Sequence, residues 1–133
     1  MTNQDRISGP LLDRIDIQIE VAAMPPDELA RAADGEPTAS IAARVAAAYA
    51  RQLKRQRSSN QRLSTHGIDR HCKLDAAGGA VLRESMQHFH WSARAYHRIL
   101  KVARTVADLG GERDIGVEHV KEAIQFRRGL RER

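Results

Sequence analysis

The sequence has 133 residues, enough for one compact domain, and its 41% apolar content with only 4% aromatic residues predicts a modest hydrophobic core. With 22 Lys and Arg against 17 Asp and Glu, the formal net charge of +5 allows contact with nucleic acid or nucleotide without requiring it. The single cysteine, Cys72, excludes an internal disulfide framework, and no apolar run suits a membrane span or a signal peptide. We therefore expect a small cytoplasmic domain with no membrane partner.

The first predicted regular element is a β-strand over residues 15–21, where apolar and polar side chains alternate. A short element at residues 9–14 precedes it. A single strand cannot satisfy its own backbone groups, so the pattern implies a sheet outside the sequence, an oligomeric partner or a disordered segment. Pro25 and Pro26 end the strand, Asp27 can cap a short helix to about Ala33, and a turn follows.

The rest of the sequence has helical periodicity. Thr38 or Ser40 can cap a long helix whose C-terminal end, residues 51–57, is basic. The polar residues 58–73 are expected to form a loop with one helical turn near residues 68–71. Asp75 can then cap a helix that runs to about residue 88.

The strongest helical pattern covers residues 93–109. Its apolar stripe is wide, so this helix should be central and buried on more than one side; the stripe contains Ala95, Ile99, Val102, Val106 and Leu109. Two glycines end it, and a last helix is predicted over residues 117–128. Residues 127–133 are basic and are expected to fray.

The start of the central helix contains a misplaced charge. Ser92 is a good N-cap, and Arg94 falls in the first turn, where a cation opposes the helix dipole at a cost of about 0.3–1 kcal/mol. An exposed helix N-terminus with an arginine is also an anion pocket, so Arg94 suggests a phosphate ligand. The alternative is an arginine that points to water or to a nearby carboxylate.

No complete catalytic motif is present in the sequence. We find no Gly-rich phosphate loop, no paired-cysteine motif, no nucleophile elbow and no convincing acid pair. His88 and His90 could present two imidazoles to a metal, but further ligands are not evident and surface histidines are the better interpretation, so we predict no metal site. Cys72 is interpreted as a small, partly buried side chain rather than a reactive thiolate.

Two segments carry a family resemblance: ISGPLLDRIDIQIEV at residues 7–21 and SARAYHRILKVARTVADL at residues 92–109. A Cys-x-Leu-Asp pattern at residues 72–75 and a His-Val-x-x-Ala-Ile-x-x-Arg pattern at residues 119–127 fit as well. Together these motifs resemble the C-terminal part of the magnesium-chelatase-like AAA+ ATPases. The resemblance extends over about residues 6–128.

The resemblance implies an all-α fold, a small helical bundle that forms the AAA+ C-terminal lid domain, with an unpaired strand-like segment at its N-terminus. Residues 1–24 would be a remnant of the α/β core, disordered in isolation, and residues 25–36 a linker with a short helix. Residues 37–128 would be the lid, and residues 129–133 a basic tail.

The resemblance also implies two site residues. The arginine of the Pro-Leu-Leu-x-Arg-x-Asp motif, Arg14, would be an arginine finger that acts in trans on the γ-phosphate held by a neighbouring subunit. The arginine of the Ser-Ala-Arg motif, Arg94, would be the sensor-two residue that meets the ATP phosphates from the lid. A plain alternative for Arg14 is a local surface ion pair with the adjacent Asp13 or Asp16, worth about 0–1 kcal/mol.

For the parent protein, the resemblance implies an ATP-driven DNA translocase or helicase that acts in recombination and natural transformation. ATP and magnesium would be its cofactors, and its partners would be the rest of the ATPase core, neighbouring subunits of a hexameric homo-oligomeric ring and DNA. The fragment itself would be no enzyme and would hold no cofactor. Within it, Arg98, Lys101 and Arg104 are expected at the solvated surface, with a neighbouring subunit as the alternative.

Two other functions stay open at this stage. The chain could be a metal-chelatase ATPase subunit, because the fold family is shared. It could also be an independent basic helical module that binds nucleic acid, with the cluster over residues 51–57 and the tail over residues 127–133 as its footprint.

Overall fold

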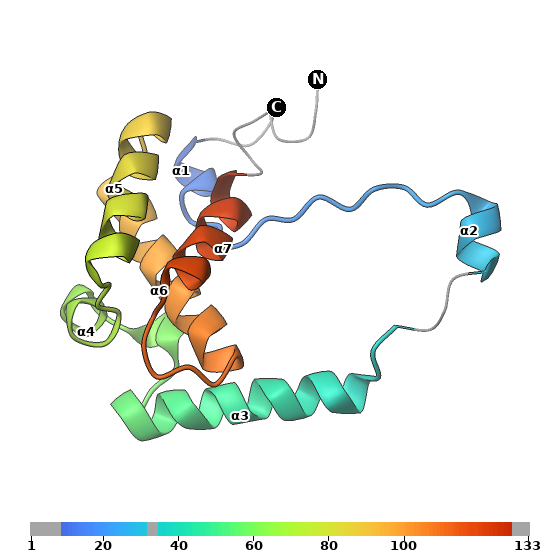
Figure 1. The fold of residues 1–133 in the computed structure, drawn as a ribbon, viewed down its shortest axis with the longest axis horizontal. Coiled ribbons are helices and arrows are strands. Elements are labelled where there is room, and N and C mark those ends of the chain that lie inside the picture. The colour runs from blue at the N-terminus through green and yellow to red at the C-terminus, as the bar shows by residue number, and fades with distance from the viewer. Residues whose placement is uncertain (1–8, 32–34, 129–133) are drawn as a thin grey trace.

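The computed structural model of the protein describes residues 9–31 and 35–128. These residues form α-helices, one 3₁₀ helix and no β-strand (Figure 1). In chain order the elements are α1 (Gly9–Leu12), α2 (Pro26–Arg31), α3 (Thr38–Gln56), η2 (Asn60–Arg62), α4 (Thr65–His71), α5 (Ala76–Phe89), α6 (Ala93–Leu109) and α7 (Val117–Arg128). The predicted all-α class is confirmed for this part of the chain.

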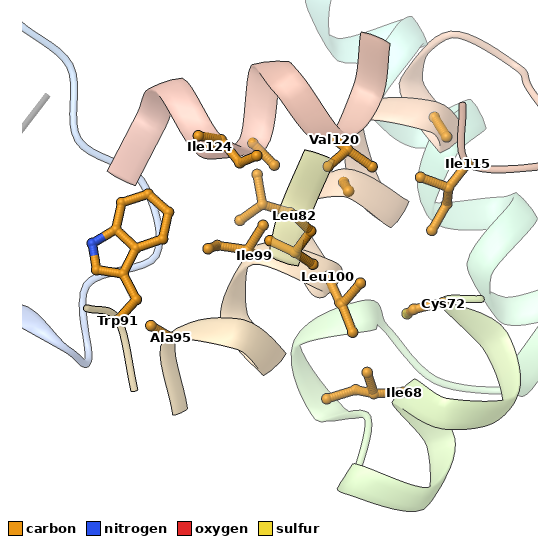
Figure 2. Packing of buried hydrophobic residues seen from close by; sticks show 14 of the residues in the cluster. Ile68, Cys72, Leu82, Trp91, Ala95, Ile99, Leu100, Ile115, Val120 and Ile124 are labelled. Atoms are coloured by element: carbon orange, nitrogen blue, oxygen red, sulfur yellow. The ribbon is translucent and has the colours of Figure 1, made fainter. Parts of the chain in front are cut away.

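Helix α6 is the centre of the bundle. It contacts α7, α3, α4 and η2, while α5 packs on α7. Ala103 and Ala107 are fully inaccessible, and such small side chains allow neighbouring elements to approach closely. Figure 2 shows Leu82 of α5, Ile99 of α6 and Ile124 of α7 in the same buried cluster. Full burial of each such side chain contributes about 1.5–3 kcal/mol, so this contact layer holds the helices together.

Two predicted helix caps are formed. The Ser92 hydroxyl oxygen accepts a hydrogen bond from the Ala95 N–H at 3.2 Å, and the Asp75 carboxylate accepts one from the Gly78 N–H at 2.7 Å. Each bond satisfies a backbone donor that the first turn of a helix leaves unpaired. The starts of α5 and α6 therefore lie where the sequence predicts them.

The expected loop between α3 and α5 is more ordered than predicted. Instead of one turn it contains η2 and the seven-residue helix α4. Ser64 caps α4 by accepting from the Gly67 N–H at 3.2 Å, and Leu63 and Ile68 are buried. Two buried apolar side chains and one cap stabilise a helix whose sequence is too polar to show a clear period.

Residues 15–21 form no strand of a sheet in the described part of the chain, which agrees with the expected unpaired strand-like segment. The segment is extended but belongs to no sheet, and its backbone has a hydrogen bond from the Gln18 N–H to the Phe126 carbonyl oxygen, 3.0 Å. It therefore lies against the end of α7 instead of pairing with a strand. Alternation predicts which side chains share a face, but a strand needs a partner to complete its ladder.

Beyond this segment the chain leaves the bundle, forms α2 and returns as the long helix α3 (Figure 1). Helix α2 begins at Pro26, so Asp27 lies in its first turn and is not its cap, and the predicted end near residue 33 falls outside the described residues. The C-terminal half of α3 packs on α6 and buries Ala48 and Gln52. Its N-terminal half projects beyond the bundle, where Val45 is 52% exposed.

Candidate functional site

Arg94 lies in the first turn of α6, and its side chain is exposed. It borders a groove of about 470 Å³ between the start of α6 and the start of α4. The groove is lined by Leu63, Ser64, Thr65, Ile68, Arg94, His97, Arg98 and Lys101. An arginine at this place opposes the helix dipole, and an anion bound beside it would relieve that opposition.

The cations of this groove differ in their partners. Arg98 donates to the Asp16 carboxylate at 2.5 Å, and Lys101 donates to the Gln61 carbonyl oxygen at 2.9 Å. Arg94 makes no hydrogen bond or ion pair within residues 9–31 and 35–128. Of these three cations, Arg94 is the one whose charged group has no partner in the described part of the chain, which leaves it open to a ligand. Arg98 and Lys101 are partly exposed at the surface, as expected, and tertiary contacts engage both.

Arg14 follows α1, where its backbone N–H donates to the Leu11 carbonyl oxygen at 3.0 Å. Its side chain is exposed, and neither flanking acid pairs with it. Asp13 instead lies 2.8 Å from Arg127, and Asp16 pairs with Arg98. The alternative of a local ion pair for Arg14 is therefore not formed in the part of the chain that the structure describes.

The two predicted site residues belong to segments that are tied together. Asp16, two positions after Arg14, contacts Arg98, one helical turn after Arg94. The segment that carries Arg14 is thus fastened to the helix that carries Arg94. Sequence spacing gave no sign of this link, because it joins residues 82 positions apart.

Arg127 departs from the sequence interpretation. It was expected in a fraying tail, but it lies within α7 and only 5% of it is exposed. Its guanidinium donates to the Asp13 carboxylate at 2.8 Å and to the Ile15 carbonyl oxygen at 3.4 Å. The rest of the predicted tail, residues 129–133, lies outside the described residues.

A buried polar cluster lies around Asp108, near the C-terminal end of α6. Its carboxylate lies 2.8 Å from Arg55 and 3.1 Å from Arg104, and it accepts a hydrogen bond from Asn60 at 3.0 Å. Burial acts to raise the pKa of Asp108, but the hydrogen bonds from Arg55 and Asn60 and the charge of Arg104 outweigh it and lower that pKa. The cluster joins α3 and η2 to α6.

This cluster corrects two expectations about basic residues. Arg104 is 3% exposed and donates to the Glu112 and Arg113 carbonyl oxygens, so it is not at the solvated surface. Arg51 donates to the Asp108 carbonyl oxygen at 2.6 Å, so the basic end of α3 is partly used inside the bundle. The four-residue spacing of Arg104 and Asp108 was a signal that could have predicted their pairing.

In the part of the chain that the structure describes, the other reactive side chains do not form a site. Cys72 is 2% exposed, and burial raises its pKa to about 11, so the thiolate is disfavoured. Burial and the nearby Arg70 lower the pKa of His71. Within residues 9–31 and 35–128 no three His, Cys, Asp or Glu side chains are grouped as metal ligands would be. Among these residues no helix combines the length and apolar character that crossing a membrane requires.

This chain is similar to one protein family and to several bacterial proteins over most of its length. A family model described as magnesium chelatase, subunit ChlI C-terminal, matches residues 35–127. Competence protein ComM of Haemophilus influenzae is 40% identical over 128 residues, which cover 96% of this chain. The uncharacterized protein YifB of Salmonella typhimurium is 40% identical over 124 residues, 92% of the chain. The uncharacterized protein Rv2897c of Mycobacterium tuberculosis is 32% identical over 126 residues, also 92% of the chain.

The matched regions are small parts of these relatives. They cover 25% of the Haemophilus protein, 24% of the Salmonella protein and 25% of the Mycobacterium protein. The chain therefore spans about a quarter of the length of the relatives it matches.

Proposed function

This chain belongs to the magnesium chelatase subunit ChlI C-terminal family, and from that premise we propose that it forms the helical lid of an AAA+ ATPase like ComM. The lid would contribute one phosphate-sensing arginine, Arg94, and the segment before it, a remnant of the ATPase core, would contribute one arginine finger, Arg14. The supporting observation is that both arginine side chains are exposed and unpaired in the described residues. Arg14 has no ion pair there because the two acids nearest to it pair with other arginines.

Arg94 would act as the sensor-two residue of the lid. Its place in the first turn of α6, beside a groove with cationic lining, suits contact with phosphate oxygens. Arginine keeps its charge at all physiological pH values and offers a fixed set of donors to such oxygens. Loss of Arg94 should therefore weaken both nucleotide binding and hydrolysis.

Arg14 would act as the arginine finger in trans. Phosphoryl transfer is catalysed chiefly by positioning and by cations around the transferring group, and a finger contributes about 10³–10⁵ in rate. A side chain with this role must be free of internal ion pairs so that it can reach a neighbouring subunit. The exposed Arg14 side chain meets that requirement in the described part of the chain.

The parent protein is proposed to be an ATP- and magnesium-dependent motor that acts on DNA in recombination and natural transformation. The support is the 40% identity to a competence protein along 96% of this chain. Its subunits would assemble as a homo-oligomeric ring, because Arg14 needs a neighbour's nucleotide. The family description keeps a metal-chelatase ATPase subunit as the second candidate.

The independent nucleic-acid-binding module has less support. Arg51, Arg55 and Arg127, which belong to its two expected footprints, are used for contacts within the bundle. Side chains engaged in this way are less available to phosphates of a duplex. A weak and only mildly salt-dependent affinity of this chain for DNA is the expected result.

The test of the proposed function uses the full-length protein. Nucleotide affinity and turnover are measured for Arg14→Ala and Arg94→Ala. We expect Arg14→Ala to lose turnover with nearly normal affinity and Arg94→Ala to lose both. Normal turnover in both variants would contradict the proposal.

A further inference from the structure

Two acids flank Arg14, and each pairs with an arginine from a different helix. The Asp13 carboxylate lies 2.8 Å from Arg127 on α7, and the Asp16 carboxylate lies 2.5 Å from Arg98 on α6. The chain is therefore held by one ion pair just before Arg14 and by another just after it. This arrangement leaves the Arg14 guanidinium exposed instead of drawing it into a local pair.

The anchor at Asp13 is the more shielded of the two. The side chain of Arg127 is 5% exposed and that of Asp13 is 27% exposed. Arg127 also donates to the Ile15 carbonyl oxygen, and the Gln18 N–H donates to the Phe126 carbonyl oxygen. Side-chain and backbone contacts thus fix residues 13–18 on the end of α7.

The anchor at Asp16 connects this segment to the candidate phosphate site. Arg98 follows Arg94 by one turn of α6, and both line the same groove. A rigid helix therefore carries Arg94 and Arg98 together, and Arg98 holds Asp16. A displacement of α6 has to move the Arg14 segment as long as both ion pairs persist.

We propose that Asp13 and Asp16 are positioning residues for Arg14. By pairing with Arg127 and Arg98 they fasten the finger segment to the lid, so that a lid movement started by phosphate at Arg94 moves the finger offered to the next subunit. The inference rests on the proposed functions of Arg14 and Arg94. It adds a physical link between the nucleotide of one subunit and the active site of its neighbour.

The test removes both carboxylate charges in the full-length ring, with the variant Asp13→Asn/Asp16→Asn. Because small displacements of a catalytic group cost up to about 100-fold in rate, we expect turnover to fall by about 10- to 100-fold. Nucleotide affinity should not fall, because the substitutions leave Arg94 in place and keep the positive charge of Arg98 in the groove. Asp16→Glu, which keeps a carboxylate, should retain more turnover than Asp16→Asn.

A matched control is Glu36→Gln, because Glu36 forms an exposed ion pair with Arg44, 2.6 Å, that does not involve the Arg14 segment. Its turnover should equal that of the unaltered ring. In addition, amide hydrogen exchange at Gln18 should be faster in the double variant, whereas exchange within the core of α6 should be unchanged.

The outcomes separate the two hypotheses. Normal turnover of the double variant, in a ring that Arg14→Ala inactivates, overturns the positioning role and leaves the finger in place. A parallel loss of nucleotide affinity, or an equal loss in Glu36→Gln, also overturns it, since either indicates general damage to the lid. A fully active Arg14→Ala ring overturns the proposed function itself and this inference with it.

Discussion

Arg55 on α3 and Asp108 on α6 form an ion pair of 2.8 Å that joins the C-terminal ends of the two helices. The Asp108 side chain is 1% exposed, so its charge depends on Arg55, on Arg104 and on the amide of Asn60 for compensation. Burial of a carboxylate is unfavourable by itself, but a carboxylate with several donors fixes how the surrounding elements meet. The cluster determines how the long α3 attaches to the bundle.

Replacing Asp108 by Ala is expected to destabilise the bundle strongly. Removal of one partner leaves the Arg55 and Arg104 guanidinium groups without their carboxylate, which typically costs about 3–5 kcal/mol. The free energy of unfolding of this chain, measured by urea denaturation, is the readout. Glu36→Gln is the control, because it breaks an exposed pair and should hardly change the midpoint. Equal midpoints for Asp108→Ala and Glu36→Gln would contradict the role of the cluster.

The same cluster predicts that the folded chain loses stability at acidic pH. The pKa of Asp108 is lowered in the folded state from its ordinary value of 3.8, so the folded state binds the proton less readily than the unfolded state. The contribution of Asp108 is therefore complete above pH 3.8 and is lost as the pH falls through the folded pKa. Thermal unfolding midpoints between pH 2 and pH 6 should fall less steeply for Asp108→Asn than for the unaltered chain. Parallel curves for the two proteins would contradict this assignment.

Cys72 is expected to react slowly in the folded chain. Its pKa is raised to about 11 by burial, so little thiolate exists near neutral pH, and the side chain is inaccessible. Labelling by a thiol reagent at pH 8 should be slow in buffer and fast in denaturant, with Cys72→Ala as the unlabelled reference. Rapid labelling of the folded protein would show that the core near α4 opens easily.

The long helices could be predicted from the sequence because their signals are local. Apolar periodicity depends on neighbouring helical turns, and a helix cap depends on residues within one turn. Helices α5 and α6 start where the caps Asp75 and Ser92 predict. The pairs Asp13–Arg127 and Asp16–Arg98 could not be predicted in this way. Each joins distant parts of the chain, so its existence depends on how α6 and α7 pack. For the same reason Arg127 was expected in a fraying tail and is buried. Arg104 is buried as well, but its partner Asp108 lies only four positions away, so that pair carried a local signal.

The finger role of Arg14 and the sensor-two role of Arg94 came from the family resemblance, while the first-turn position of Arg94 indicated a phosphate ligand by itself. The geometry adds that both side chains are exposed and that Arg94 borders a groove. The strand-like segment has no sheet partner in the described residues for a related reason. Period-two alternation over residues 15–21 describes a surface with one apolar face, whereas the backbone partner that makes a strand lies elsewhere. A strand in a complete ATPase core and an extended segment on α7 are both compatible with the same alternation.

The chain as a separate protein is expected to have no ATPase activity. Its sequence contains no Gly-rich phosphate loop, so the two arginines would assist a reaction whose main phosphate site is absent. Phosphate release from purified chain, measured with ATP and magnesium, should equal the buffer background. Turnover above that background that disappears in Arg94→Ala would contradict the proposed lid function.

The last prediction concerns mixed rings of the full-length protein. If Arg14 acts in trans, a subunit with Arg14→Ala still offers an intact nucleotide pocket, and a subunit with a disabled phosphate loop still offers an intact finger. Each variant alone should be inactive. A ring of Arg14→Ala subunits lacks the finger, which lowers the rate by about 10³–10⁵, and a ring of subunits with a disabled phosphate loop lacks an intact nucleotide pocket. Mixed rings should recover activity wherever an intact finger faces an intact pocket. Arg94→Ala should not be rescued in the same way, because it affects the nucleotide bound within its own subunit. Absence of recovery in mixed rings of verified assembly would count against Arg14 as the finger.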